Sequence, residues 1–198
     1  MKEIIILLVL LVFSVTLMAQ PIFNLGIKAG INNSKVTLNS SEFTSESIVK
    51  THIGAFGRLG WSRIYLQPEI YYSAKGGRVL QKNVSPIDRV STFDYSTVDI
   101  PMLAGVKVLK GGAANFRVMG GPVFCLMTTK KLNTGDLLDK QYYNNHYFGY
   151  QYGLGVDFLN FFIDARMEHS ANRFYYQPAE GIDGNNRTFM LSVGFKIL

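Results

Sequence analysis

The chain has 198 residues and a single cysteine, Cys125, so no disulfide can form within it. Its fold must be held by other interactions, and we interpret Cys125 as a packing residue. A proline- or serine-rich linker and low-complexity stretches are also absent, which predicts one domain. The net charge is +6, but no run of five or six positive residues marks a basic arm. Together with the export signal described next, this argues against nucleic acid as a partner.

Long apolar runs are scarce, and the one at the start of the chain extends from Ile4 to Met18. Its length of roughly 15 residues falls short of the ~20 that a transmembrane helix needs. The preceding lysine and the Ala19 at its end are typical of a secretory signal peptide. We therefore expect residues 1–19 to be cleaved off and residues 20–198 to form the exported domain. No cysteine follows the run, which disfavours a lipid-anchored lipoprotein.

Beyond this run no stretch has the apolar period of a helix, whereas alternation of apolar and polar residues recurs about eight times. The segment "NFFIDARMEHS" (160–170) places apolar residues on one parity and charges on the other. Successive side chains of a strand point to opposite faces, so the pattern predicts strands between two different solvents. The expected strands are approximately 22–36, 50–61, 63–75, 94–109, 115–128, 146–158, 160–171 and 187–197.

The connections between these strands alternate in length. Tight connections at 61–63, 110–115 and 159–160 alternate with long ones at roughly 37–49, 76–93, 129–145 and 172–186. This organisation is typical of bacterial outer-membrane barrels. We predict an all-β fold, an eight-stranded antiparallel up-and-down transmembrane β-barrel in the cell outer membrane of a Gram-negative bacterium, with both termini periplasmic. The alternative is a secreted β-sandwich or lipocalin-like barrel, whose outer face would be polar.

The charged parity is expected to face a narrow lumen, where glycines among the charges leave room for large side chains. Six cations and five anions share this parity, and buried charges are tolerated when they are paired. We expect a structural charge network that plugs the lumen, made of Lys28, Arg58, Glu69, Asp99, Lys107, Arg117, Asp157, Asp164, Arg166, Glu168 and Lys196. A selective ion or proton path, and hence a small channel, is the alternative.

Aromatic residues gather at the strand ends, which is typical of a girdle at the membrane interface. The girdle is predicted to include Trp61, Tyr65, Tyr71, Tyr72, Tyr95 and the aromatic residues of 142–148. Three further aromatics, Phe174, Tyr175 and Tyr176, fall in the fourth long loop. Exposed aromatics commonly anchor binding, so these three are candidate contacts for a protein or glycan partner. In the alternative interpretation they fold over the rim. Membrane lipid and lipopolysaccharide are the other expected partners.

Patterns for catalysis or metal binding are sparse. Of the three histidines, His52 has inward parity, whereas His146 and His169 share the parity of the apolar residues. A lipid-modifying enzyme would need an inward histidine within hydrogen-bond reach of a carboxylate or a serine. No group of His, Cys and Asp has metal-ligand spacing, so we expect no metal and no cofactor. The prediction is a non-enzymatic surface-interaction or membrane-complex component, with a lipid-modifying enzyme as the alternative.

Five segments carry a resemblance to a known family: "LGIKAGINNS", "YLQPEIYYSAKGG", "VDIPMLAGVKV", "FRVMGGPVF" and "YQYGLGVDFLNFFIDARME". Together they resemble the PorT-like eight-stranded outer-membrane β-barrel proteins over essentially the whole mature chain, with "LQPE" and "DIP" as the most specific elements. The resemblance implies a small barrel whose individual role stays open. The founding member is linked to a secretion system, a role that similarity alone does not transfer. Members often end on an aromatic residue, whereas this chain ends in "FKIL", so Phe195 is expected to serve instead.

Overall fold

The computed structural model describes residues 22–38, 43–81, 89–133, 145–172, 175–177 and 182–198. The expected signal peptide, 1–19, lies outside the described residues. Within them no helix is long and apolar enough to span a membrane. The strands are β1 (Ile22–Leu38), β2 (Phe43–Trp61), β3 (Ile64–Gln81), β4 (Arg89–Lys110), β5 (Ala114–Asn133), β6 (His146–Phe158), β7 (Phe161–Ser170), β8 (Tyr175–Gln177) and β9 (Ile182–Lys196).

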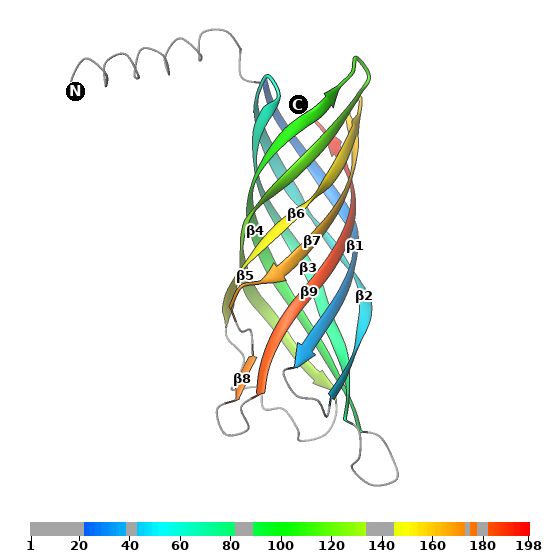
Figure 1. The fold of residues 1–198 in the computed structure, drawn as a ribbon, viewed down its shortest axis with the longest axis vertical. Coiled ribbons are helices and arrows are strands. Elements are labelled where there is room, and N and C mark those ends of the chain that lie inside the picture. The colour runs from blue at the N-terminus through cyan, green and yellow to red at the C-terminus, as the bar shows by residue number, and fades with distance from the viewer. Residues whose placement is uncertain (1–21, 39–42, 82–88, 134–144, 173–174, 178–181) are drawn as a thin grey trace, which may run out of the picture.

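Eight long strands form a closed antiparallel barrel, which confirms the predicted fold class (Figure 1). Consecutive strands pair from β1 to β7, β7 pairs with β9, and β9 returns to β1. The closing register runs from Gly26 opposite Lys196 to Leu38 opposite Gly184. The short β8 pairs with β9 beyond the end of β7. Closure leaves no unpaired edge in the ring, as a sheet surrounded by hydrocarbon requires.

The tight connections gather at one end of the barrel, where β1 also begins and β9 ends (Figure 1). Ser62, in the β2–β3 turn, has a φ of 55°, and Leu159, in the β6–β7 turn, has a φ of 52°. Both are left-handed backbone conformations, which such short reversals require. The other end carries the long connections and β8, and we call it the long-loop end.

The strands extend further toward the long-loop end than predicted. β2 begins at Phe43 instead of 50, β4 begins at Arg89 instead of 94, and β5 ends at Asn133 instead of 128. The hydrogen-bond ladder continues there although the alternation of apolar and polar residues fades. The physical reason is that beyond the lipid-facing band both faces of the wall meet water. Polar residues are then allowed on both faces, so alternation no longer marks the strand in the sequence.

The two faces of the barrel wall have opposite chemistry. Apolar side chains on the outside are largely exposed, for example 36% at Leu66 and 65% at Ile53, and they encircle the barrel on all eight long strands. Charged and polar side chains of the other parity are buried in the lumen. An exposed apolar surface of this extent marks contact with a membrane.

Ala165 lies on the outward face of β7, opposite Leu154 of β6 and Leu191 of β9. We expect Ala165→Arg to lower the free energy of unfolding by about 2–4 kcal/mol, because the cation would face hydrocarbon near the midplane. Urea unfolding of the protein in lipid vesicles, followed by the fluorescence of Trp61, measures the change. Asn160→Arg, at the tight β6–β7 turn, is the matched control and is expected to cost less than about 1 kcal/mol. Equal losses in the two variants would contradict a lipid-facing outer wall.

Candidate functional site in the barrel lumen

Charged side chains form a continuous ladder of ion pairs along the lumen. Nζ of Lys28 donates to Oε2 of Glu69 at 2.6 Å. The guanidinium of Arg166 donates to both oxygens of Glu69, at 2.8 and 2.9 Å, and to Oδ2 of Asp164 at 2.5 Å. All four side chains are sealed from solvent. Arg166 therefore joins two carboxylates, and Glu69 joins two cations.

The ladder continues toward the tight-turn end through Arg117. Its Nη2 donates to Oδ1 of Asp164 at 2.7 Å, and its Nε lies 2.9 Å from Oδ2 of Asp157. Nη1 of Arg58 donates to both oxygens of Asp157, at 3.0 and 3.2 Å. Nζ of Lys196 lies 3.8 Å from the same carboxylate. Charges of opposite sign thus alternate from the middle of the lumen to its tight-turn mouth.

Lys107 and Lys196 were predicted inside the lumen, but the structure places them at its mouth. Both side chains are only half-buried. Lys107 lies opposite Arg117 in the β4–β5 register, close to the last turn of the wall. Both ammonium groups lie where solvent can reach them, so neither needs the complete set of partners that the deeper cations have.

Tyr65, Tyr71, Tyr95 and Tyr147 do not belong to the interfacial girdle, so that part of the prediction is wrong. They are 1–3% exposed and lie in the lumen. The hydroxyl of Tyr65 accepts a hydrogen bond from Nη1 of Arg117 at 3.3 Å, and its ring lies 5.2 Å from the guanidinium carbon of Arg58. The rings fill space between the ion pairs and offer a π-face to the cations. These tyrosines have the inward parity of their strands, as Glu69 and Asp99 do. Parity therefore predicts a position in the lumen, whereas their position near the strand ends had indicated the girdle.

A second cluster surrounds Lys75, a residue that the predicted network omitted. Nζ of Lys75 lies 2.8 Å from Oδ2 of Asp99 and donates to Oε1 of Glu168 at 2.5 Å. It also donates to the hydroxyl of Tyr147 at 3.0 Å. Lys75 ends the predicted strand 63–75, but it shares the parity of Glu69 and is fully buried. Its inclusion gives the two acids of this cluster their cation.

This cluster also brings together three side chains with metal-ligating atoms. Single ligand atoms of Asp99, Cys125 and Glu168 lie within 4.8 Å of one another. Nζ of Lys75 lies 3.9 Å from Sγ of Cys125, in addition to its contacts with both carboxylates. An ammonium among the ligand atoms opposes a metal cation electrostatically, so the donor set fits a lysine better than a metal ion.

A chain of hydrogen bonds centred on His52 lies deeper toward the long-loop end. Nε2 of His52 lies 2.8 Å from Oγ of Ser192, and its Nδ1 lies 2.7 Å from Oδ1 of Asn32. Nδ2 of Asn32 donates to Oγ of Ser73 at 2.8 Å. Serine, histidine and an orienting amide are the parts of an activated nucleophile. The sequence indicated that His52 points inward but did not identify Ser192 as its neighbour, because the two meet only when β9 closes on β1.

The predicted binding residues lie apart from the lumen network. Phe174 lies outside the described residues. Tyr175 and Tyr176 begin β8 and pair with Gly184 and Asp183 of β9. They therefore belong to a short hairpin at the long-loop end rather than to an unpaired loop.

Comparisons with known proteins agree with this architecture. A family model described as "Outer membrane protein beta-barrel domain" matches residues 18–175. The outer membrane protein OprG from Pseudomonas aeruginosa is 12% identical, with a TM-score of 0.53 over 90% of this chain and 96% of that chain. Neisserial surface protein A is 10% identical, with a TM-score of 0.46 over 87% and 97%. Ail of Yersinia pestis is 15% identical, with a TM-score of 0.44 over 88% and 98%. No curated protein matches the chain. At these identities the likeness to OprG concerns the fold alone.

Arg166 is the central cation of the ladder. We expect Arg166→Leu to lower the free energy of unfolding by about 3–5 kcal/mol, because Asp164 loses a buried partner and Glu69 loses one of two. Arg63→Leu is the matched control, since the Arg63 side chain is exposed and its Nη1 donates to the backbone carbonyl of Val108 at 3.2 Å. Urea unfolding midpoints in vesicles decide the result, and equal midpoints for the two variants would contradict a structural role for the ladder.

The serine and histidine of the His52 chain can be tested for reactivity. We expect a fluorophosphonate probe to leave Ser192 unmodified in the folded protein, because Ser192 is 1% and His52 2% exposed. Mass spectrometry of the detergent-solubilised protein measures labelling, with Ser62→Ala in the exposed β2–β3 turn as the control for non-specific reaction. Labelling that disappears in both Ser192→Ala and His52→Ala would establish a reactive nucleophile instead.

Proposed function

Because this chain belongs to the outer membrane protein beta-barrel domain family, we propose that it is a non-enzymatic integral outer-membrane protein that acts as a surface-interaction or membrane-complex component. The observation that supports this proposal is the filled lumen. Its charged side chains form ion pairs with one another inside the barrel. Groups that could recognise a partner therefore lie at the two ends of the barrel.

The lumen network argues against the channel alternative. An ion path needs a continuous run of water, whereas Lys28, Glu69 and Arg166 bridge the middle of the barrel with side chains that are 0% exposed. Eight strands leave an interior just wide enough for side chains. Stepwise conductance of the purified protein in a planar bilayer would favour a channel over the plugged barrel.

The enzyme alternative has one specific observation in its favour, the contact of Ser192 with His52 and of His52 with Asn32. This geometry meets the condition for an activated serine. Access argues against it, because all three side chains are at most 2% exposed and the described part of the barrel leaves Oγ of Ser192 covered. We therefore propose a structural role for this hydrogen-bond chain.

We also propose that the chain is a PorT-like member of the family. Its two specific motifs carry lumen residues with defined partners. In "LQPE", Gln67 accepts from Nε of Arg58 at 2.6 Å and donates to Oε1 of Glu69 at 2.6 Å. In "DIP", Asp99 pairs with Lys75. The two motifs thus contribute residues to the ion-pair ladder and to the Lys75 cluster. This gives the sequence resemblance a physical basis.

The proposed orientation places both termini in the periplasm and the long-loop end outside the cell, as in other outer-membrane barrels with long extracellular loops. Recognition tends to lie on loops that a rigid scaffold holds. The proposed partners are lipopolysaccharide and membrane lipid around the wall, and a protein or glycan at the long-loop end. Phe174, Tyr175 and Tyr176 are the proposed contacts for that partner.

The triple variant Phe174→Ser, Tyr175→Ser and Tyr176→Ser tests the proposed surface role. We expect it to remain a heat-modifiable barrel on gels but to lose a partner that the wild-type protein captures from outer-membrane extracts, because exposed aromatics anchor interfaces. Trp61→Ser is the control, since Trp61 is an exposed aromatic at the opposite end. Capture that survives the triple variant would contradict the proposed contacts, and loss of heat-modifiability would show that the rings pack on the rim.

A further inference from the structure

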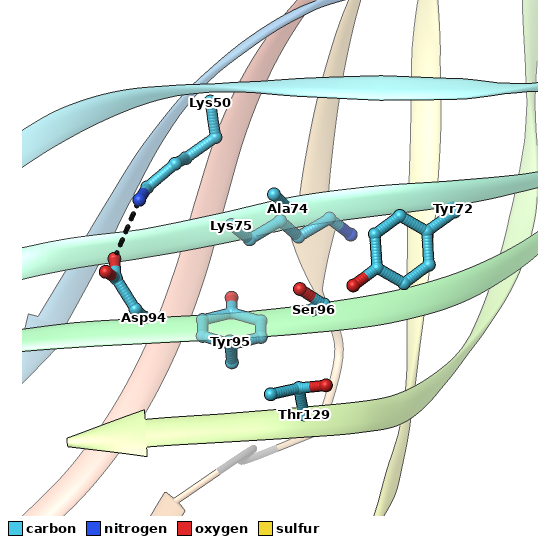
Figure 2. A pocket seen from close by; sticks show the side chains of 8 residues that line it. All are labelled: Lys50, Tyr72, Ala74, Lys75, Asp94, Tyr95, Ser96 and Thr129. Carbon is cyan, nitrogen blue, oxygen red and sulfur yellow. Dashed lines mark ion pairs between the residues drawn. The ribbon is translucent and has the colours of Figure 1, made fainter.

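A pocket of about 400 Å³ opens in the barrel wall across β2, β3, β4 and β5 (Figure 2). It lies toward the long-loop end, far from the tight turns. Its lining residues are Lys50, Tyr72, Ala74, Lys75, Asp94, Tyr95, Ser96 and Thr129. The proposed function assigns it no role.

An irregularity in the sheet creates this pocket. The β2–β3 register shifts between Glu46 and His52, and Lys50 lies within that segment. Its ammonium reaches across β3 to Oδ1 of Asp94 on β4, at 3.1 Å (Figure 2). The two side chains are 34% and 31% exposed, so the ion pair is accessible from outside. The residue of β3 opposite Asp94 is Gly76, which has no side chain to stand between the two charged groups.

The pocket lies where the apolar band of the outer wall ends. On β3 the outward residues change from Ile70 and Tyr72, which are 53% and 46% exposed, to Ala74. On β4 they change from Ile100 to Ser96 and Asp94. A tyrosine followed by hydroxyl and charged groups is typical of the level of the lipid headgroups. The pocket therefore faces headgroups rather than acyl chains.

The pocket combines the ammonium of Lys50 with several groups that bind hydroxyls, whereas the ammonium of Lys75 is paired with Asp99 and Glu168 in the lumen. Lys50 supplies an ammonium for a phosphate, and the hydroxyls of Ser96 and Thr129 can donate or accept. The carboxylate of Asp94 is 31% exposed, so beside its ion pair with Lys50 it can accept a hydrogen bond from a ligand hydroxyl. The ring of Tyr72 offers a flat face for the apolar side of a sugar.

We infer that this pocket binds the phosphorylated sugar headgroup of lipopolysaccharide in the outer leaflet. A carboxylate beside the cation repels a bare phosphate, whereas it accepts hydrogen bonds from sugar hydroxyls, so the set favours a phosphosugar over a phospholipid phosphate. The inference rests on the proposed function in one respect, because that orientation puts the long-loop end in the outer leaflet.

The test is binding of lipid A to the purified mature protein in detergent micelles, measured by native mass spectrometry against phosphatidylglycerol. We expect preference for lipid A, and we expect Lys50→Gln to weaken lipid A binding by about tenfold, as loss of one charge-assisted hydrogen bond does. Asp94→Asn should also weaken it. Lys35→Gln is the matched control, since Lys35 is an exposed lysine at the same end of β1 outside the pocket. Heat-modifiability on gels verifies that each variant is folded.

Thr129→Phe fills the pocket without changing any charge and decides the question if Lys50→Gln does not fold. Loss of binding in Thr129→Phe with retention in Lys35→Gln supports the site. Equal binding of phosphatidylglycerol and lipid A by the wild type, or equal losses in Lys35→Gln and Lys50→Gln, would overturn it. Either result leaves the proposed surface role untouched, because capture by the loop aromatics is measured separately.

Discussion

A backbone surrounded by hydrocarbon has no water to bond with, and the rest of this structure depends on that constraint. Every N–H and C=O in the lipid-facing band must find its partner within the sheet, so the sheet has to close on itself. Closure with eight strands sets a narrow interior. Because the outer face must be apolar, polar residues are confined to that interior, where they have to satisfy one another.

The ladder through Arg166 and Arg117 is a solution to this confinement. A single buried charge is costly, and an isolated pair leaves donors and acceptors unfilled. Arg166 divides its guanidinium between Glu69 and Asp164, and Arg117 divides its own between Asp164 and Asp157. Arginine suits these shared positions because its planar group donates in several directions at once.

Glycines in the lumen follow from the same limit on space. At Gly155 an added Cβ would meet the carboxylate of Asp164 and the guanidinium of Arg117, and at Gly105 it would meet the ring of Tyr65. Each bulky side chain on one wall is thus matched by a missing one opposite or beside it. Loss of such a glycine would displace the ladder even though the glycine carries no charge.

Parity was sufficient to predict the fold and the sides of the wall, because a two-residue period converts directly into lipid-facing and lumen-facing residues. It also assigned Arg166 and Glu69 to one face. Parity does not predict which lumen charges pair with one another. Whether Asp157 meets Arg58 or Lys107 depends on register and barrel shear, which alternation does not encode. Position near a strand end is a weaker indicator than parity: Lys75 and Tyr95 lie close to predicted loops, yet both share the inward parity of Glu69 and Asp99 and are buried.

The His52 chain shows why geometry alone does not establish chemistry in such an interior. A buried imidazole must have both ring nitrogens satisfied, and nearby serine and asparagine side chains are efficient partners. An array that resembles an activated serine therefore arises whenever histidine is buried among small polar residues. What separates a catalyst from a satisfied histidine is a route for substrate to the nucleophile. Ser192 is 1% exposed, and within the described residues β9 and β1 separate it from lipid while the ladder fills the lumen on its tight-turn side.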